Sequence, residues 1–156
     1  MNIILLTHQR ELTKTTNTGS LVVDVLGDRA EVIVWQRNNP SPVLLDYIAQ
    51  GSTALLYPSN DSQPISGCDV YQYYIIIDST WQEAQKMYNR SPYLHDLPRV
   101  KIQSDAPSAY HLRRNQRPGC LCTVECAIEV IRATGFDDYA DDLQSRFISY
   151  LSLARS

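Results

Sequence analysis

Short apolar segments alternate along the chain with longer segments in which apolar residues recur every three to four positions. The first pattern indicates buried strands and the second indicates amphipathic helices. Strands that are apolar throughout and separated by helices predict a single α/β domain with a mostly parallel sheet and helices on both faces. The expected strands are 2–6, 30–35, 52–58, 70–77 and 99–103, and the expected helices are 18–26, 41–51, 81–88, 124–131 and 139–151.

Turn and capping residues separate these segments. The helix 41–51 has Ser41 as its cap, Pro42 in its first turn and Gly51 at its exit. The segment 58–67 is rich in Pro, Ser, Asn and Gly and is the most loop-like stretch of the chain. In parallel sheets ligands bind beyond the carboxyl ends of the strands. The loops after residues 57, 77 and 103 are therefore the places where a site is expected.

The strand 70–77 runs directly into an acidic residue, Asp78. Thr80 followed by Glu83 fits a capping box, in which each side chain accepts a bond from a free N–H of the first helical turn. Asp78 then lies at the tip of the sheet, near the positive end of the helix dipole. Two roles remain open: Asp78 is itself the helix cap, or it serves a site. Trp81 is likewise either a core residue or a ring that stacks on a ligand.

Two further loops have similar chemistry. The second is 57–61, and the third is 117–126, where Pro118 and Gly119 form a turn, Thr123 can cap a helix and Glu125 lies in its first turn. Together the loops predict a pocket of backbone donors and acceptors for a small polar ligand with an adenine-like ring. The chain has no G-x-G-x-x-G or P-loop motif, and its three histidines show no triad spacing.

Composition places the chain among ordinary globular proteins. It has 156 residues, 44% of them hydrophobic, and no apolar run approaches the roughly 18 residues that a membrane span needs. The N-terminal segment lacks the basic region and cleavage site of a signal peptide, so a cytoplasmic protein is expected.

Charge is distributed unevenly. The net charge is −3, but residues 86–117 hold 7 Lys and Arg against 2 Asp and Glu, whereas the segments on either side are acidic. This pattern fits a protein with one face that meets a polyanion, and it equally fits a solvated basic surface without a partner.

The cysteines do not form a recognisable framework. Cys120, Cys122 and Cys126 follow a C-x-C-x3-C pattern, which is neither a disulfide framework nor a standard zinc spacing, and Cys68 lies far from them. Reduced thiols without a metal are expected. The alternative is a metal site completed by His95 or His111.

Six segments, in order, resemble the DTW-domain family, named for the signature that appears here as Asp78-Ser79-Thr80-Trp81. The same order and similar residues cover most of the chain. The segments are THQRELTKTTNTGSL (7–21), ALLYPS (54–59), DSTWQEAQKM (78–87), SPYLHDLPRV (91–100), YHLRRNQRPG (110–119) and LCTVECAIEVI (121–131).

The resemblance implies a tRNA-uridine aminocarboxypropyltransferase, which moves the 3-amino-3-carboxypropyl group of S-adenosylmethionine to N3 of a uridine and releases methylthioadenosine. It also implies a SPOUT-like fold, in which a C-terminal trefoil knot is possible, and no metal. The cofactor-binding residues that it implies are Leu56, Tyr57, Pro58, Ser59, Asp78, Ser79, Thr80, Trp81, Leu121, Cys122, Thr123 and Glu125.

Asp78 is the candidate catalytic residue. It either accepts the N3 proton or binds the ammonium or ribose of the cofactor, and a carboxylate beside a helix N-terminus favours the binding role. Candidate RNA contacts are basic side chains, which suit phosphate, and a tyrosine for stacking on an unpaired base. They are Arg99, Lys101, Tyr110, Arg113, Arg114 and Arg117.

Larger family members carry a cysteine cluster ahead of the domain that looks zinc-binding, and this chain is expected to be a single DTW domain (1–156) without one. Cys122 lies where the family more often has serine, so it is expected to pack or to form a hydrogen bond and not to act as a nucleophile. Three other functions stay open: a SPOUT-type RNA methyltransferase, a catalytically silent RNA-binding DTW module and a flavodoxin-like small-molecule binder.

Overall fold

A computed structural model of the chain describes residues 1–10, 18–58, 61–65, 71–102 and 123–155. Within these ranges, six parallel strands form one sheet in the order β2-β1-β5-β3-β6-β4, so the predicted parallel sheet is confirmed. The strands are β1 (Asn2–His8), β2 (Ala30–Trp35), β3 (Thr53–Leu56), β4 (Gln63–Pro64), β5 (Tyr73–Asp78) and β6 (Arg99–Lys101). β4 lies inside the segment expected to be a loop, because two residues are too few to show a pattern.

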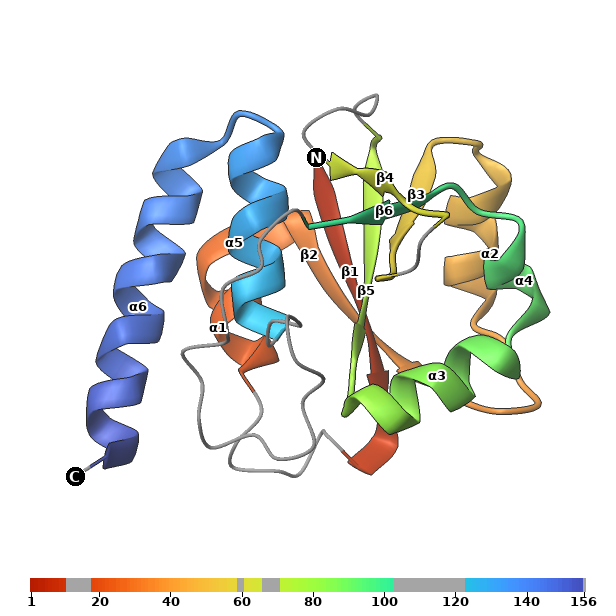
Figure 1. Cartoon of the computed structure of the whole chain (residues 1–156), viewed down its shortest axis with the longest axis horizontal. Coiled ribbons are helices and arrows are strands. Elements are labelled where there is room, and N and C mark those ends of the chain that lie inside the picture. The colour runs from red at the N-terminus through yellow and green to blue at the C-terminus, as the bar shows by residue number, and fades with distance from the viewer. Residues whose placement is uncertain (11–17, 59–60, 66–70, 103–122, 156) are drawn as a thin grey trace.

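Helices cover both faces of this sheet, as expected. α1, α5 and α6 lie on one face, and α2, α3 and α4 lie on the other (Figure 1). The helices are α1 (Gly19–Leu26), the 3-10 turn η2 (Gly27–Arg29), α2 (Pro42–Ala49), α3 (Trp81–Asn89), α4 (Pro92–His95), α5 (Thr123–Ala133) and α6 (Asp137–Arg155). In the part of the chain that the structure describes, none of them combines the length and the apolar character that a membrane crossing requires.

The central strands are apolar throughout because both of their faces are buried. Ile3 and Leu5 of β1 pack with Tyr74 of β5 in the cluster under α1, α5 and α6. Ile4 and Ile75 face the opposite way and pack under α2, α3 and α4. Side chains alternate between the faces of a strand, so each of these strands contributes to two cores.

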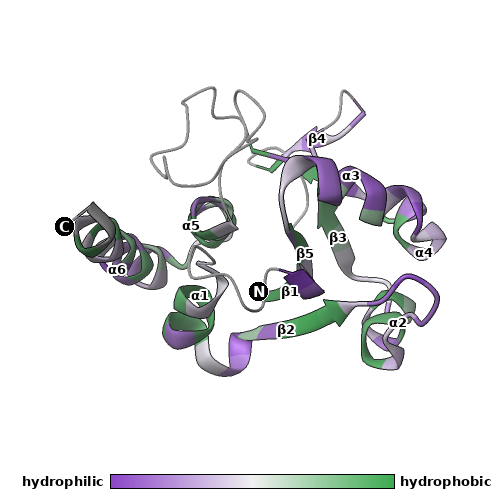
Figure 2. Ribbon diagram, turned by 90° about the horizontal axis from the view of Figure 1, so that it is seen from below, coloured by the Kyte–Doolittle hydropathy of each residue, from purple (hydrophilic) through white to green (hydrophobic). Residues whose placement is uncertain are grey.

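After two neighbouring strands of this sheet, the chain continues to helices on opposite faces. β1 leads towards α1 on one face, whereas β5 leads directly into α3 on the other, and Thr7 pairs with Asp78 at their carboxyl ends. Such a switch point is where open α/β sheets bind ligands. Figure 2 views the sheet from this end, with the tips of β1 and β5 between α1, α5 and α3.

Candidate active site

Asp78 is the last residue of β5, and its side chain is 1% exposed. The hydroxyl of Thr123, in the first turn of α5, donates a hydrogen bond of 2.7 Å to its Oδ1. A hydrogen bond to a carboxylate is stronger than one between neutral groups. This bond ties the start of α5 to the tip of the sheet, across 45 positions of sequence.

Asp78 does not cap α3. The cap is Thr80, which has extended backbone angles and whose side chain accepts a bond of 3.3 Å from the N–H of Glu83. The sequence left two roles open for Asp78, and the role of helix cap belongs to Thr80. The acidic group remains at the sheet tip, with Thr123 as a partner.

The rest of the expected capping chemistry was wrong in two places. Glu83 does not bond back to the cap: its Oε1 accepts a bond of 3.3 Å from the guanidinium of Arg10, and its Oε2 lies 3.5 Å from Nδ1 of His8. The guanidinium of Arg10, two residues after β1, is therefore the hydrogen-bond donor to Glu83 in place of the backbone N–H. Thr123 is already the first residue of α5, and its hydroxyl serves Asp78.

The cluster around His8 was missed from the sequence. The His8 ring stacks on the Trp35 ring, with centroids 5.9 Å apart. The indole N–H of Trp35 donates a hydrogen bond of 2.8 Å to the hydroxyl of Ser91, a buried residue. No spacing in the sequence marks His8 and Glu83 as neighbours. Only the strand order, with β1 beside β5, brings them together.

An aromatic pair joins the first two predicted loops. Tyr57, just after β3, lies 5.7 Å from the ring of Trp81, and its other neighbour is Tyr88 at 4.4 Å. Trp81 is only half-buried, so it is not the fully enclosed core residue that was one of its two predicted roles. Leu56 and Pro58, two further predicted site residues, flank Tyr57 in sequence. The hydroxyl of Ser79 donates a hydrogen bond of 3.1 Å to the carbonyl of Thr80.

The RNA-contact predictions fall partly inside the described residues. The Arg99 side chain is 28% exposed. Its guanidinium donates a hydrogen bond of 3.2 Å to the hydroxyl of Tyr88 and lies 3.7 Å from the carboxylate of Asp61. Lys101 ends β6, and Glu125 lies in the first turn of α5 as expected. The remaining predicted site residues lie outside the described ranges: Ser59, Leu121, Cys122, Tyr110, Arg113, Arg114 and Arg117.

The thiols and histidines give no metal centre in the described ranges, where no three His, Cys, Asp or Glu side chains gather. Cys126 is half-buried on α5, and Nε2 of His95 faces the carbonyl oxygen of Tyr88 at 2.7 Å. Cys68, Cys120, Cys122 and His111 lie outside the described residues.

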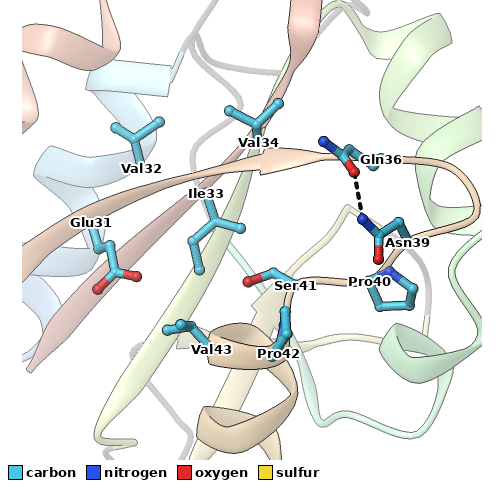
Figure 3. A pocket seen from close by; sticks show the side chains of 10 residues that line it. All are labelled: Glu31, Val32, Ile33, Val34, Gln36, Asn39, Pro40, Ser41, Pro42 and Val43. Atoms are coloured by element: carbon cyan, nitrogen blue, oxygen red, sulfur yellow. Dashed lines mark hydrogen bonds between the residues drawn. The ribbon is translucent and has the colours of Figure 1, made fainter.

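A separate open groove of about 370 Å³ lies at the edge of the sheet, along β2 and the start of α2 (Figure 3). Its lining includes the exposed side chains of Val32, Val34 and Val43. Glu31, also in the lining, accepts a bond of 2.9 Å from the Tyr47 hydroxyl, which raises the pKa of Tyr47. β1 separates this groove from Asp78 on β5, so it belongs to a different part of the molecule.

Comparisons with known proteins connect the chain to one family and to two named relatives. The sequence model of the DTW domain matches residues 1–153. A Drosophila melanogaster protein named "tRNA-uridine aminocarboxypropyltransferase 2" is 40% identical over 83 residues, which are 51% of this chain and 33% of that protein. A Macaca fascicularis protein of the same name is 25% identical over 149 residues, 90% of this chain and 50% of that protein.

The chain thus spans at most about half the length of these two relatives. No solved structure gives a significant match. Because the family model covers all but the last three residues, the chain belongs to the DTW domain family.

Proposed function

We propose that this chain transfers the 3-amino-3-carboxypropyl group of S-adenosylmethionine to N3 of a uridine in tRNA, releasing methylthioadenosine. The observation that carries the proposal is the buried carboxylate of Asp78 at the carboxyl end of β5, held by Thr123 and not used as a helix cap. It lies at a switch point of the sheet, where α/β folds bind ligands. The names of the two relatives support the same reaction, although each is at least about twice as long as the segment it shares with this chain.

The reaction makes modest chemical demands on the protein. The bond between uridine N3 and the γ-carbon forms as the bond from that carbon to sulfur breaks, the sulfonium becomes a neutral thioether, and the N3 proton is released to solvent water. A sulfonium is a good leaving group, so orientation and exclusion of water are the main tasks. No covalent intermediate is needed.

The described residues fit these tasks. An anionic Asp78 can bind the α-ammonium of the amino acid arm, and the Tyr57 and Trp81 rings lie at the adjoining loop, where an adenine or uracil ring could stack. Thr123 fixes the direction of the carboxylate. Because Asp78 is buried, its Coulomb attraction to an ammonium is screened less than it would be in water.

The tRNA is proposed to approach along α3, which leaves the sheet directly after Asp78. Lys86 and Arg90 are exposed on this helix, four positions apart. Neither has an ion-pair partner among the described residues, whereas Glu83 of the same helix is paired with Arg10. In Figure 2 much of the α3 ribbon has the purple colour of hydrophilic residues. Unpaired cations suit the phosphates of a nucleic acid.

S-Adenosylmethionine labelled separately in its methyl and carboxyl groups tests the reaction. After incubation with the protein and tRNA, the carboxyl label should enter RNA and the methyl label should remain in the nucleoside product. Methyl label in RNA would identify a methyltransferase instead. Binding of RNA with neither label transferred would identify a catalytically silent module.

A further inference from the structure

Thr18, at the N-terminus of α1, has a fully buried side chain. The residue is 0% exposed, and among the residues that the structure describes its Oγ1 has no hydrogen-bond partner. Thr18 occupies the cap position of α1 but makes no side-chain cap bond, and the first turn of the helix has no acidic residue. A buried hydroxyl without a partner is costly, because its hydrogen bonds with water are lost and not replaced.

The N-terminus of α1 lies on the same side of the sheet as Asp78. Val22 of α1 and Val124 of α5 belong to one core cluster, and Asp78 is bonded to Thr123, the neighbour of Val124. Both helices begin at the end of the molecule where β1 and β5 have their carboxyl ends (Figure 1). Two helix starts and one carboxylate therefore surround the same end of one core.

The N-terminus of a helix attracts anions, because its first N–H groups have no acceptor within the helix and its dipole is positive there. Asp78 attracts a cation. A ligand with an ammonium and a carboxylate on one carbon has both charges, and the amino acid arm of S-adenosylmethionine is such a ligand.

We propose that the Thr18 hydroxyl and the N-terminus of α1 bind the α-carboxylate of this arm, while Asp78 binds its α-ammonium. This inference rests on the proposed function and adds the residue that recognises the carboxylate. Holding the arm at both charges fixes its γ-carbon, and not the methyl group, in the position for attack. Thr18 is thus a determinant of which group is transferred.

Three ligands separate the carboxylate from the rest of the cofactor: S-adenosylmethionine, its decarboxylated analogue and methylthioadenosine. Their dissociation constants are measured by calorimetry for the wild type, Thr18→Val and Thr18→Ser. Thr18→Val should raise the dissociation constant of S-adenosylmethionine by about 10- to 100-fold, the range for a hydrogen bond to a charged group. The dissociation constants of the other two ligands should stay within about twofold of the wild-type values. Thr18→Ser, which keeps the hydroxyl, should bind all three like the wild type.

The unliganded protein gives a second readout. Valine removes the unsatisfied hydroxyl at almost the same volume, so the Tm of Thr18→Val should equal or exceed that of the wild type. A lower Tm with equal weakening of all three ligands would assign Thr18 a structural role and overturn the inference. Unchanged binding of S-adenosylmethionine would also overturn it. If the wild type binds none of the three, the proposed function fails and this inference fails with it; if the wild type binds and transfers normally, only the role of Thr18 is at stake.

Discussion

The hydroxyl of Thr123 donates a hydrogen bond of 2.7 Å to the carboxylate of Asp78, and both side chains are buried. One residue ends the central strand β5 and the other begins α5, so the bond connects the sheet to the helix layer at the end where a ligand is expected. The bond fixes the direction of this buried carboxylate within the folded protein. Such preorganisation lowers the cost of binding.

The first prediction concerns this bond. Thr123→Val should weaken S-adenosylmethionine binding by about 10-fold and reduce the free energy of unfolding by about 1.5–3 kcal/mol, because a buried acceptor loses a charge-assisted donor. Thr123→Ser is the matched control and should restore both quantities. Calorimetry and urea unfolding give the two measurements. Wild-type affinity in the valine variant would show that the bond does not orient Asp78.

The second prediction concerns Trp81. The chain has two tryptophans, so Trp35→Phe leaves Trp81 as its only indole. Because Trp81 lies half-buried beside Tyr57, a stacked adenine should change its fluorescence when methylthioadenosine is added. The reciprocal variant, Trp81→Phe, should lose that response. A signal that is constant in the presence of saturating ligand would remove Trp81 from the cofactor site.

The third prediction concerns the exposed cations of α3. Lys86→Gln with Arg90→Gln should weaken tRNA binding and lower the slope of log K against log salt by about 1.4–1.8, because two fewer phosphates are neutralised. Affinity for S-adenosylmethionine should stay unchanged.

Arg146 offers a matched control for α3, because it is a surface arginine on α6 that is already paired with Asp142 at 3.2 Å. Arg146→Gln should leave the salt slope as it is in the wild type. Equal slopes for the α3 double variant and the wild type would place the RNA elsewhere on the protein.

The fourth prediction concerns the predicted basic segment 110–117, which lies outside the described residues. Arg113→Ala with Arg114→Ala should also reduce RNA affinity and flatten its salt dependence, since fewer counterions are released. The measurement is the same salt titration. An unchanged slope would exclude this segment from the RNA interface.

Much of the fold follows from the sequence because its signals are local. The apolar runs at 2–6 and 70–77 became the central strands β1 and β5, and the four-residue spacing of Leu143, Phe147 and Leu151 became the buried stripe of α6. Gly135, two residues after the end of α5, has φ 89°. Such backbone angles favour glycine, so the break after α5 is encoded by a single residue.

The site was less predictable because its contacts are distant in sequence. The capping box motif identified Thr80 correctly, but the partners of Glu83 are His8, the last residue of β1, and Arg10 just after it, more than 70 positions away. Likewise, the Thr123 hydroxyl had a satisfactory local role as a cap, and only the three-dimensional structure offers it a carboxylate. Local patterns cannot rank a hydrogen-bond partner that is near in sequence against one that the fold brings into reach.

The central claim is that the carboxylate of Asp78 binds the amino acid arm of the cofactor for transfer to uridine. The most direct test is mass spectrometry of nucleosides from tRNA treated with S-adenosylmethionine and either the wild type or Asp78→Asn, after equal Tm values have established that both are folded. The wild type should produce a carboxypropyl adduct on uridine, and the variant should be slower by at least about 30-fold, since a buried charge pair is lost. Equal adduct formation by the two proteins, or no adduct from the wild type, would contradict the claim.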